Sequence, residues 1–170
     1  MAKNEFERFV IIAYGRTRST LLSKLLNNHP HIGCEEEIFL GHYFNEGRAP
    51  IIARLLGKKK ADANDLNELH QFRQQDPIGF MDHFYSLMAK HKHHVGFKIF
   101  PEQNLEALDH ILKNREIKKI LLVRNFLFSH VSVKQSMASD SWFTRKGEKN
   151  ELPKIEFQKK RFFKYLQKRV

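Results

Sequence analysis

FVIIAYGRTRSTLLSKLLNN, residues 9–28, is the stretch that decides the fold of this chain. Its first six residues are apolar or aromatic and partly β-branched, which predicts a strand buried on both faces. A polar turn with one glycine, two arginines and three hydroxyl groups follows, and leucines then recur at helical spacing in a helix that begins near Ser19. Because the unpaired amides at a helix N-terminus attract anions, this strand-turn-helix predicts a phosphate site.

The composition indicates a folded chain with a strong positive charge. Its 170 residues are 41% hydrophobic and include 15 phenylalanines, which predicts a single globular domain rather than a disordered chain. The net charge of +11 predicts attraction to polyanions, whether nucleic acid, an anionic membrane or a phosphorylated small molecule. The chain has one cysteine, no secretory leader at its N-terminus and no apolar run of roughly 20 residues, so we expect a cytoplasmic protein.

Strands and helices are expected to alternate along the rest of the chain. Further strands are predicted at residues 31–34, 95–100 and 120–123, and the last of these is expected to be buried. Short helices are expected within residues 41–75, and longer helices at residues 76–91, 105–112 and 126–138. A charged loop at residues 139–153 then precedes a helix in the basic C-terminal segment. This order predicts an α/β fold of three layers, with a mostly parallel sheet flanked by helices. Since sites in such folds lie beyond the carboxyl ends of the strands, we expect residues 16–20, residues 101–103 and Arg124 to be neighbours.

The polar turn lacks the GxxxxGK[ST] signature of a P-loop, and therefore the lysine and the magnesium-binding hydroxyl that hold a nucleoside triphosphate. It resembles instead the 5′-phosphosulfate loop of sulfotransferases, enzymes that use 3′-phosphoadenosine 5′-phosphosulfate (PAPS), although the family usually has glycine where Arg18 stands. The resemblance implies a P-loop NTPase-like sulfotransferase fold. It also implies that the 5′-phosphosulfate is bound by Arg16, Thr17, Arg18, Ser19, Thr20 and Leu21.

A second motif follows the predicted strand at residues 120–123. Arg124 stands directly after that strand, and Ser132 lies eight residues further on, within the next predicted helix. This spacing resembles the 3′-phosphate motif of sulfotransferases, in which both residues bind the phosphate on the ribose of PAPS. Arginine suits this role because its planar guanidinium donates two parallel hydrogen bonds to one phosphate.

The segment HPHIGCEEEIF, residues 29–39, resembles a segment of bacterial carbohydrate sulfotransferases, the trehalose sulfotransferase among them, that supplies the catalytic base. An acceptor hydroxyl needs a carboxylate or an imidazole within hydrogen-bond reach to take its proton. Glu37, directly before Ile38, fits the family position best. Glu35 and Glu36 stay open as alternates, and so does a purely solvated acidic face.

Lys98 is the one charged residue in the predicted strand at residues 95–100. A lysine in an apolar strand is unusual unless its ammonium reaches an anion or a cavity, and the strand resembles the family's internal strand with its single lysine. We expect Lys98 near the acceptor or the sulfuryl group, with a side chain that reaches out to solvent as the alternative. Together with Arg16 and Glu37, it completes the set of catalytic residues that the resemblance implies.

The resemblance covers roughly residues 8–140 and implies a PAPS-dependent sulfotransferase that moves a sulfuryl group to a hydroxyl of a carbohydrate or related small acceptor. Residues 1–170 are expected to form one domain that lacks the family's usual C-terminal part, and the reaction needs no metal. Two alternatives stay open. One is a member that binds PAPS or adenosine 3′,5′-bisphosphate but catalyses weakly or not at all; the other is a P-loop kinase-like or basic nucleic-acid-binding protein.

Two further patterns carry less functional weight. The histidines of HKHH, residues 91–94, lack the spacing of an HExxH metal site and have no cysteine partners, so a solvated loop is favoured and no metal site is predicted. The basic segments at residues 57–60 and 158–169 leave a peripheral contact with an anionic membrane open. No specific nucleic-acid partner is expected.

Overall fold

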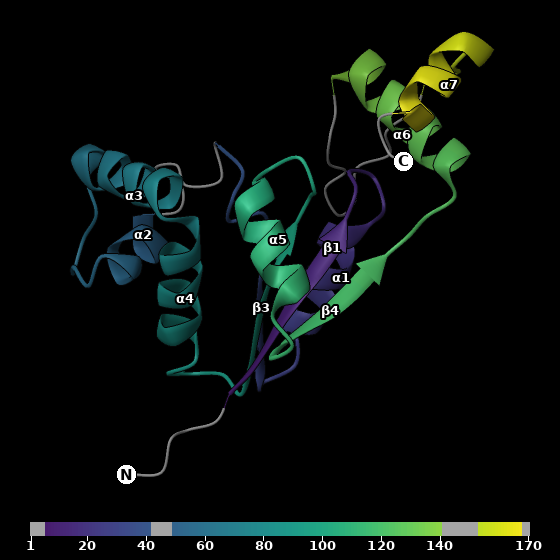
Figure 1. Cartoon of the computed structure of the whole chain (residues 1–170). Coiled ribbons are helices and arrows are strands. Elements are labelled where there is room, and N and C mark those ends of the chain that lie inside the picture. Colours follow the sequence, from purple (N-terminus) through teal and green to yellow (C-terminus); the bar gives the residue numbers. More distant parts are fainter. Residues whose placement is uncertain (1–5, 42–48, 141–152, 168–170) are drawn as a thin grey trace.

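The computed structural model describes residues 6–41, 49–140 and 153–167. Helices and strands alternate along these residues, and Figure 1 shows their arrangement. Their order and bounds are β1 (Glu7–Ala13), α1 (Ser19–Asn27), β2 (Ile32–Glu35), α2 (Ala49–Leu55), α3 (Ala63–Gln75), α4 (Pro77–Met88), β3 (His94–Ile99), α5 (Leu105–Lys113), β4 (Ile117–Leu122), α6 (Phe126–Ser139) and α7 (Lys159–Gln167). Most of the charged loop expected at residues 139–153 lies outside the described residues.

The four strands form one parallel sheet in the order β2-β3-β1-β4. β1 lies inside the sheet, with Val10 opposite Phe97 of β3 on one side and opposite Lys119 of β4 on the other. Each neighbouring pair is parallel, so the carboxyl ends of all four strands lie at the same edge. The predicted α/β class and the parallel sheet are confirmed.

Alternate residues of β1 enter two separate cores, one on each face of the sheet. Val10 and Ile12 belong to the larger core, which α4 and α5 help to form and in which the rings of Phe39 and Phe84 pack edge to face against Phe97. Ile11 belongs to the smaller core on the opposite face, beside α1. The sheet is therefore the middle of three layers, as the sequence predicts.

Two of the predicted helices begin with a polar cap. Asp76 accepts a hydrogen bond from the Gly79 amide at 2.8 Å, and Pro77 opens α4, which relieves that helix of one unpaired donor. Asn125 caps α6 in the same way, because its side chain accepts a hydrogen bond from the Leu127 amide at 2.9 Å. This second cap begins a helix directly after Arg124 and so holds that arginine at the corner between β4 and α6.

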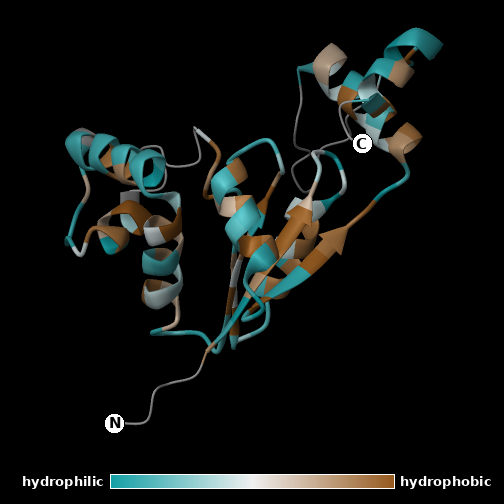
Figure 2. Ribbon diagram, viewed as in Figure 1, coloured by the Kyte–Doolittle hydropathy of each residue, from teal (hydrophilic) through white to brown (hydrophobic). Residues whose placement is uncertain are grey.

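The prediction of a buried strand at residues 120–123 is wrong in its burial. Among the described residues β4 pairs only with β1, and its side chains are largely exposed, with Leu121 71% exposed. Figure 2 shows that the end of β4 is hydrophobic although it lies at the edge of the sheet described here. An apolar run predicts a strand, but the run alone does not say whether other elements cover that strand.

The leucines of α1 are divided in a way that their spacing did not predict. Leu22 and Leu26 pack into the smaller core, whereas Leu21 is 52% exposed and Leu25 is 57% exposed. The helix turns serine residues toward the protein instead, and Ser23 donates a hydrogen bond to the Ser19 carbonyl at 3.0 Å.

In the part of the chain that the structure describes, every helix is too short or too polar to cross a membrane.

Replacing Gly96 with alanine should destabilise the fold. Gly96 lies on β3 opposite Phe9, and a Cβ there would lie 2.4 Å from Cε2 of the Phe9 ring, inside the smaller core. We expect Gly96→Ala to lower the free energy of unfolding by about 1–3 kcal/mol, because the ring must move within a packed interior. Urea denaturation followed by circular dichroism measures the loss.

Gly41→Ala is the matched control, because a Cβ at Gly41 would meet no atom of the described residues within 4 Å. It should change the stability by less than about 0.5 kcal/mol. Equal stability of the two variants would contradict the packing of Phe9 over Gly96.

Candidate functional site

The candidate site lies where three strands end. The turn after β1, Pro101 after β3 and Arg124 after β4 meet at the carboxyl edge of the sheet, and Thr17, Pro101 and Arg124 line the same pocket. The expected convergence of these three segments is therefore present. Gln103, the last residue of the second segment, does not line this pocket, and its side-chain oxygen accepts a hydrogen bond from the Phe100 amide at 3.1 Å.

The turn after β1 has a distinct backbone geometry. Arg16 and Arg18 both adopt a φ of 68°, and Thr17 is buried and donates its hydroxyl to the Tyr14 carbonyl at 2.8 Å. Arg18 is the N-cap of α1 but makes no side-chain cap, so its side chain leaves the first amides of the helix, those of Ser19 and Thr20, to an incoming anion. These are the amides at which the sequence predicts a phosphate site.

Leu21 differs from the other residues of the predicted loop. Its amide already donates to the Arg18 carbonyl at 3.0 Å, and its side chain is half exposed. The structure therefore does not bring Leu21 to the site through either its amide or its side chain.

Arg18 occupies a backbone conformation that glycine favours. With φ at 68° and ψ at 22°, it lies in the left-handed region, where an L-residue with a Cβ is strained. The usual glycine of the sulfotransferase loop and the arginine of this chain are thus compatible with the same turn. The Arg18 side chain itself is exposed.

Arg16, Arg124 and Ser132 form one cluster, although they come from distant parts of the sequence. Arg16 donates from Nε to the Ser132 hydroxyl at 2.9 Å, and Arg124 donates from Nη1 to the Arg16 carbonyl at 2.9 Å. Burial and the positive charge of Arg124 lower the pKa of Arg16. Two guanidinium groups held this close are stabilised by an anion between or beside them.

Lys98, Glu37 and Thr20 form a second cluster. The Lys98 side chain is only 1% exposed, and its ammonium lies 3.3 Å from Glu37 Oε1 and donates to the Thr20 hydroxyl at 2.8 Å. The alternative in which Lys98 reaches out to solvent is therefore wrong. The ammonium links the predicted base to the hydroxyl of Thr20, in the first turn of α1, and so joins three sequence-predicted residues.

The three consecutive glutamates have different positions. Glu35 ends β2, and the Glu36 carbonyl accepts a hydrogen bond from the Lys98 amide at 3.2 Å. Glu37 is the member of the triplet whose carboxylate pairs with Lys98, and its side chain is 14% exposed. Glu37 therefore does not lie on a fully solvated acidic face.

Sequence reasoning missed Ser129, which is buried on α6 and lines the pocket at the strand ends. Its position three residues before Ser132 on a predicted helix was the available signal, since residues three apart lie on one helical face. The described residues contain no group of three or more histidine, cysteine, aspartate or glutamate side chains arranged to hold a metal ion.

No known family model matches the chain. The chain is similar to Nodulation protein H of Rhizobium tropici, with 30% identity over 153 residues. The aligned region covers 88% of this chain and 54% of that protein. The chain therefore spans about half the length of the curated relative that it matches.

Replacing Arg18 should reveal the backbone strain in the turn after β1. We expect Arg18→Gly to be more stable than Arg18→Ala by about 0.5–1 kcal/mol, because alanine keeps the left-handed strain and glycine removes it. Both variants lose the same charge, so thermal and urea unfolding of the pair isolate the backbone effect. If the alanine variant were equally or more stable, Arg18 would not have the left-handed conformation.

The Lys98–Glu37 pair should respond asymmetrically to substitution. Glu37→Gln leaves a buried ammonium without its counter-charge and should cost about 3 kcal/mol or more of folding stability. Lys98→Met leaves the partly exposed Glu37 carboxylate and should cost less, about 1–2 kcal/mol. The double variant should be about as stable as Lys98→Met alone, as urea denaturation of all four proteins can measure. A larger loss for Lys98→Met than for Glu37→Gln would contradict this arrangement.

Proposed function

We propose that this chain binds PAPS and belongs to a sulfotransferase that moves a sulfuryl group to a hydroxyl of a carbohydrate or related small acceptor. The observation that carries the proposal is the contact of Arg16 with Ser132 and of Arg124 with the Arg16 carbonyl. It joins the loop that resembles the 5′-phosphosulfate site to the motif that resembles the 3′-phosphate site. Nodulation protein H is a known sulfotransferase, and the similarity to it supports the same class.

The phosphate loop offers a site for the 5′-phosphosulfate end of the donor. We assign its binding to the Arg16 guanidinium and to the amides at residues 17–20, which lie at the positive end of the α1 dipole. The lowered pKa of Arg16 reflects burial and a like charge nearby, and an anion bound beside it would offset both effects.

Arg124 and Ser132 offer the second anion site. Among the described residues Arg124 forms no ion pair, and its one described hydrogen bond goes to a backbone carbonyl. Its guanidinium therefore keeps donors for the 3′-phosphate, and the Ser132 hydroxyl lies within the same cluster. Two anion sites in contact suit a donor with two separate phosphate groups better than a nucleoside triphosphate, and the loop lacks the P-loop lysine.

We assign the acid-base and charge-stabilising roles to the second cluster. PAPS supplies an activated sulfuryl group and leaves as adenosine 3′,5′-bisphosphate when the acceptor oxygen bonds to sulfur. The Glu37 carboxylate takes the proton of the acceptor hydroxyl, and the Lys98 ammonium orients that carboxylate. Through its bond to Thr20, Lys98 also lies beside the loop and stabilises negative charge that builds on the leaving phosphate.

We further propose a single domain that acts in the cytoplasm. Cys34 is the one cysteine of the chain and cannot form an intrachain disulfide, and burial raises its pKa to about 11. An unreactive, buried thiol is compatible with a reducing compartment. We also propose that the basic helix α7 contacts the surface of an anionic membrane.

Substituting Arg124 tests the proposed donor site. Arg124→Ala should weaken the binding of adenosine 3′,5′-bisphosphate by about 10- to 100-fold, because a charge-assisted pair of hydrogen bonds to a phosphate is lost. Titration calorimetry with the folded protein measures the affinity. Arg115→Ala is the matched control, since it removes the same charge from an exposed position just before the opposite end of β4.

If Arg124→Ala and Arg115→Ala lost the same affinity for adenosine 3′,5′-bisphosphate, the loss would come from the change in net charge alone. That result would refute the proposed site. A sulfation assay with PAPS and a panel of sugars then separates an active enzyme from a protein that binds the bisphosphate without turnover. Tight ATP binding that requires magnesium would favour the kinase-like alternative instead.

A further inference from the structure

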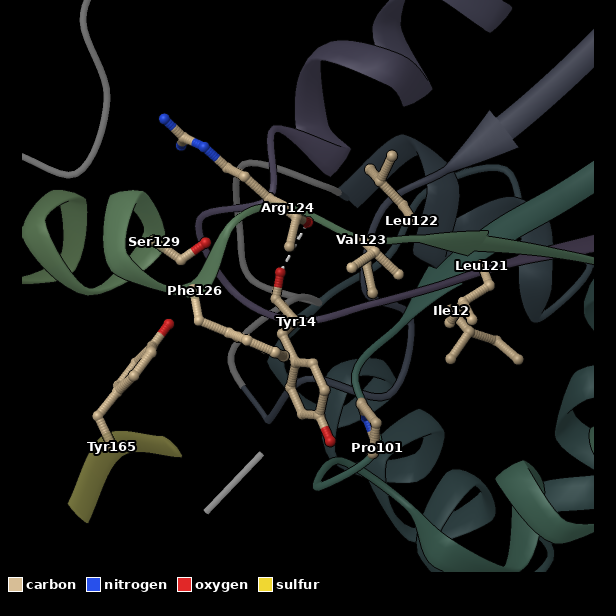
Figure 3. Close-up of a pocket in the computed structure, with 12 residues that line it drawn as sticks. Ile12, Tyr14, Pro101, Leu121, Leu122, Val123, Arg124, Phe126, Ser129 and Tyr165 are labelled. Carbon is tan, nitrogen blue, oxygen red and sulfur yellow. Dashed lines mark hydrogen bonds between the residues drawn. The ribbon is translucent and has the colours of Figure 1, made fainter. Parts of the chain in front are cut away.

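A pocket of about 260 Å³ opens at the carboxyl ends of β1 and β4, next to the proposed donor site. Its walls are mostly apolar. Ile12 and Leu121 are register partners on adjacent strands and so lie on the same face of the sheet, and Val123 continues that wall. The rings of Tyr14, Phe126 and Tyr165 line the pocket from the strand end, from α6 and from α7, respectively (Figure 3).

The pocket shares Arg124 with the cluster of Arg16, Arg124 and Ser132, but the other residues of the two clusters do not line it. Neither Arg16 nor Ser132 lines it, and neither do Glu37 and Lys98. Arg124 lines the pocket, but Figure 3 shows its guanidinium pointing away from the aromatic side chains of the pocket. The space therefore has a different chemistry from the cationic site beside it.

Ser129 lines this pocket and carries a buried hydroxyl that no contact among the described residues accounts for. Its side chain is on α6 and 2% exposed, and its hydroxyl oxygen has no hydrogen-bond partner among the described residues. Figure 3 shows this hydroxyl projecting from α6 toward the segment between β4 and the helix. A buried hydroxyl without a partner is unfavourable, and a ligand group that donates to it or accepts from it would satisfy it.

We infer that this pocket binds a neutral, two-ring aromatic molecule that carries one hydrogen-bonding group directed at Ser129. The size supports two rings, because a cavity of about 150 Å³ holds benzene and this pocket is larger. The apolar walls disfavour a charged ligand, and three aromatic side chains favour a flat ring. The inference goes beyond the proposed function and does not depend on PAPS binding.

A ligand in this pocket would also touch the phosphate loop. Thr17 lines the pocket and uses its hydroxyl to hold the Tyr14 carbonyl at 2.8 Å, which fixes the start of the turn. The aromatic site and the anion site thus share one short segment of backbone. We expect an aromatic ligand and PAPS to bind at the same time, because the Arg124 guanidinium points away from the aromatic side chains of the pocket (Figure 3).

The test uses 2-naphthol as the probe and the full chain as the protein, with titration calorimetry and ligand-observed NMR as readouts. The unmodified chain should bind 2-naphthol, and Ser129→Ala should weaken binding by about 3- to 10-fold through the loss of one neutral hydrogen bond. Ser136→Ala is the matched control, because Ser136 is equally buried on α6 but does not line the pocket. It should leave the affinity unchanged.

A second variant fills the pocket without disturbing the core. Val123 is 67% exposed, so Val123→Trp should fold normally and abolish 2-naphthol binding, whereas Leu105→Trp, at an exposed position outside the pocket, should not. The inference is overturned if the folded chain does not bind 2-naphthol, or if Val123→Trp binds as well as the unmodified chain. It is also overturned if adenosine displaces 2-naphthol, since the pocket would then belong to the nucleotide.

Discussion

The parallel pairing of β1 with β3 on one side and β4 on the other governs where the candidate residues lie. Each of these strands carries polar residues at or just after its carboxyl end, and parallel pairing puts those ends at one edge. Thr17, Pro101 and Arg124 thereby line one pocket, although more than 100 residues separate the first from the last. In an antiparallel arrangement of the same strands, some of these residues would lie at the opposite edge of the sheet and could not line the same pocket.

Buried and half-buried charges give this edge its chemistry. Lys98 is charged and almost fully inaccessible, and the fold accommodates it because Glu37 and the Thr20 hydroxyl lie within reach of its ammonium. Arg16 and Arg124 form the opposite case, two like charges near each other: Arg124 donates to the Arg16 carbonyl, and Arg16 donates to the Ser132 hydroxyl. The Lys98 ammonium is paired with a carboxylate of the protein, whereas we propose that the cluster of Arg16, Arg124 and Ser132 binds the phosphates of an external ligand.

Local patterns predicted the elements well, because strand and helix periodicity and polar caps act over a few residues. The helix that begins at Ser19 and the one capped by Asp76 are both where their sequences indicate. Burial was predicted less well. β4 is as apolar at its end as a central strand but lies at the edge of the described sheet, and two of the four leucines of α1 are exposed. Whether an apolar side chain is covered depends on elements distant in sequence, which periodicity does not report.

By itself the sequence determined the α/β class, the phosphate-type turn after the first strand and the residue types that suit two anion sites, since each of these depends on short-range chemistry. Tertiary structure alone decided that Glu37, rather than Glu35 or Glu36, pairs with Lys98, and that this lysine is buried instead of solvated. It also decided that Arg18 has the backbone of a glycine and that Ser129 is buried in an apolar pocket. The physical reason is the same in each case: these properties depend on which side chains the parallel sheet brings together, and the sequence around each residue does not contain that information.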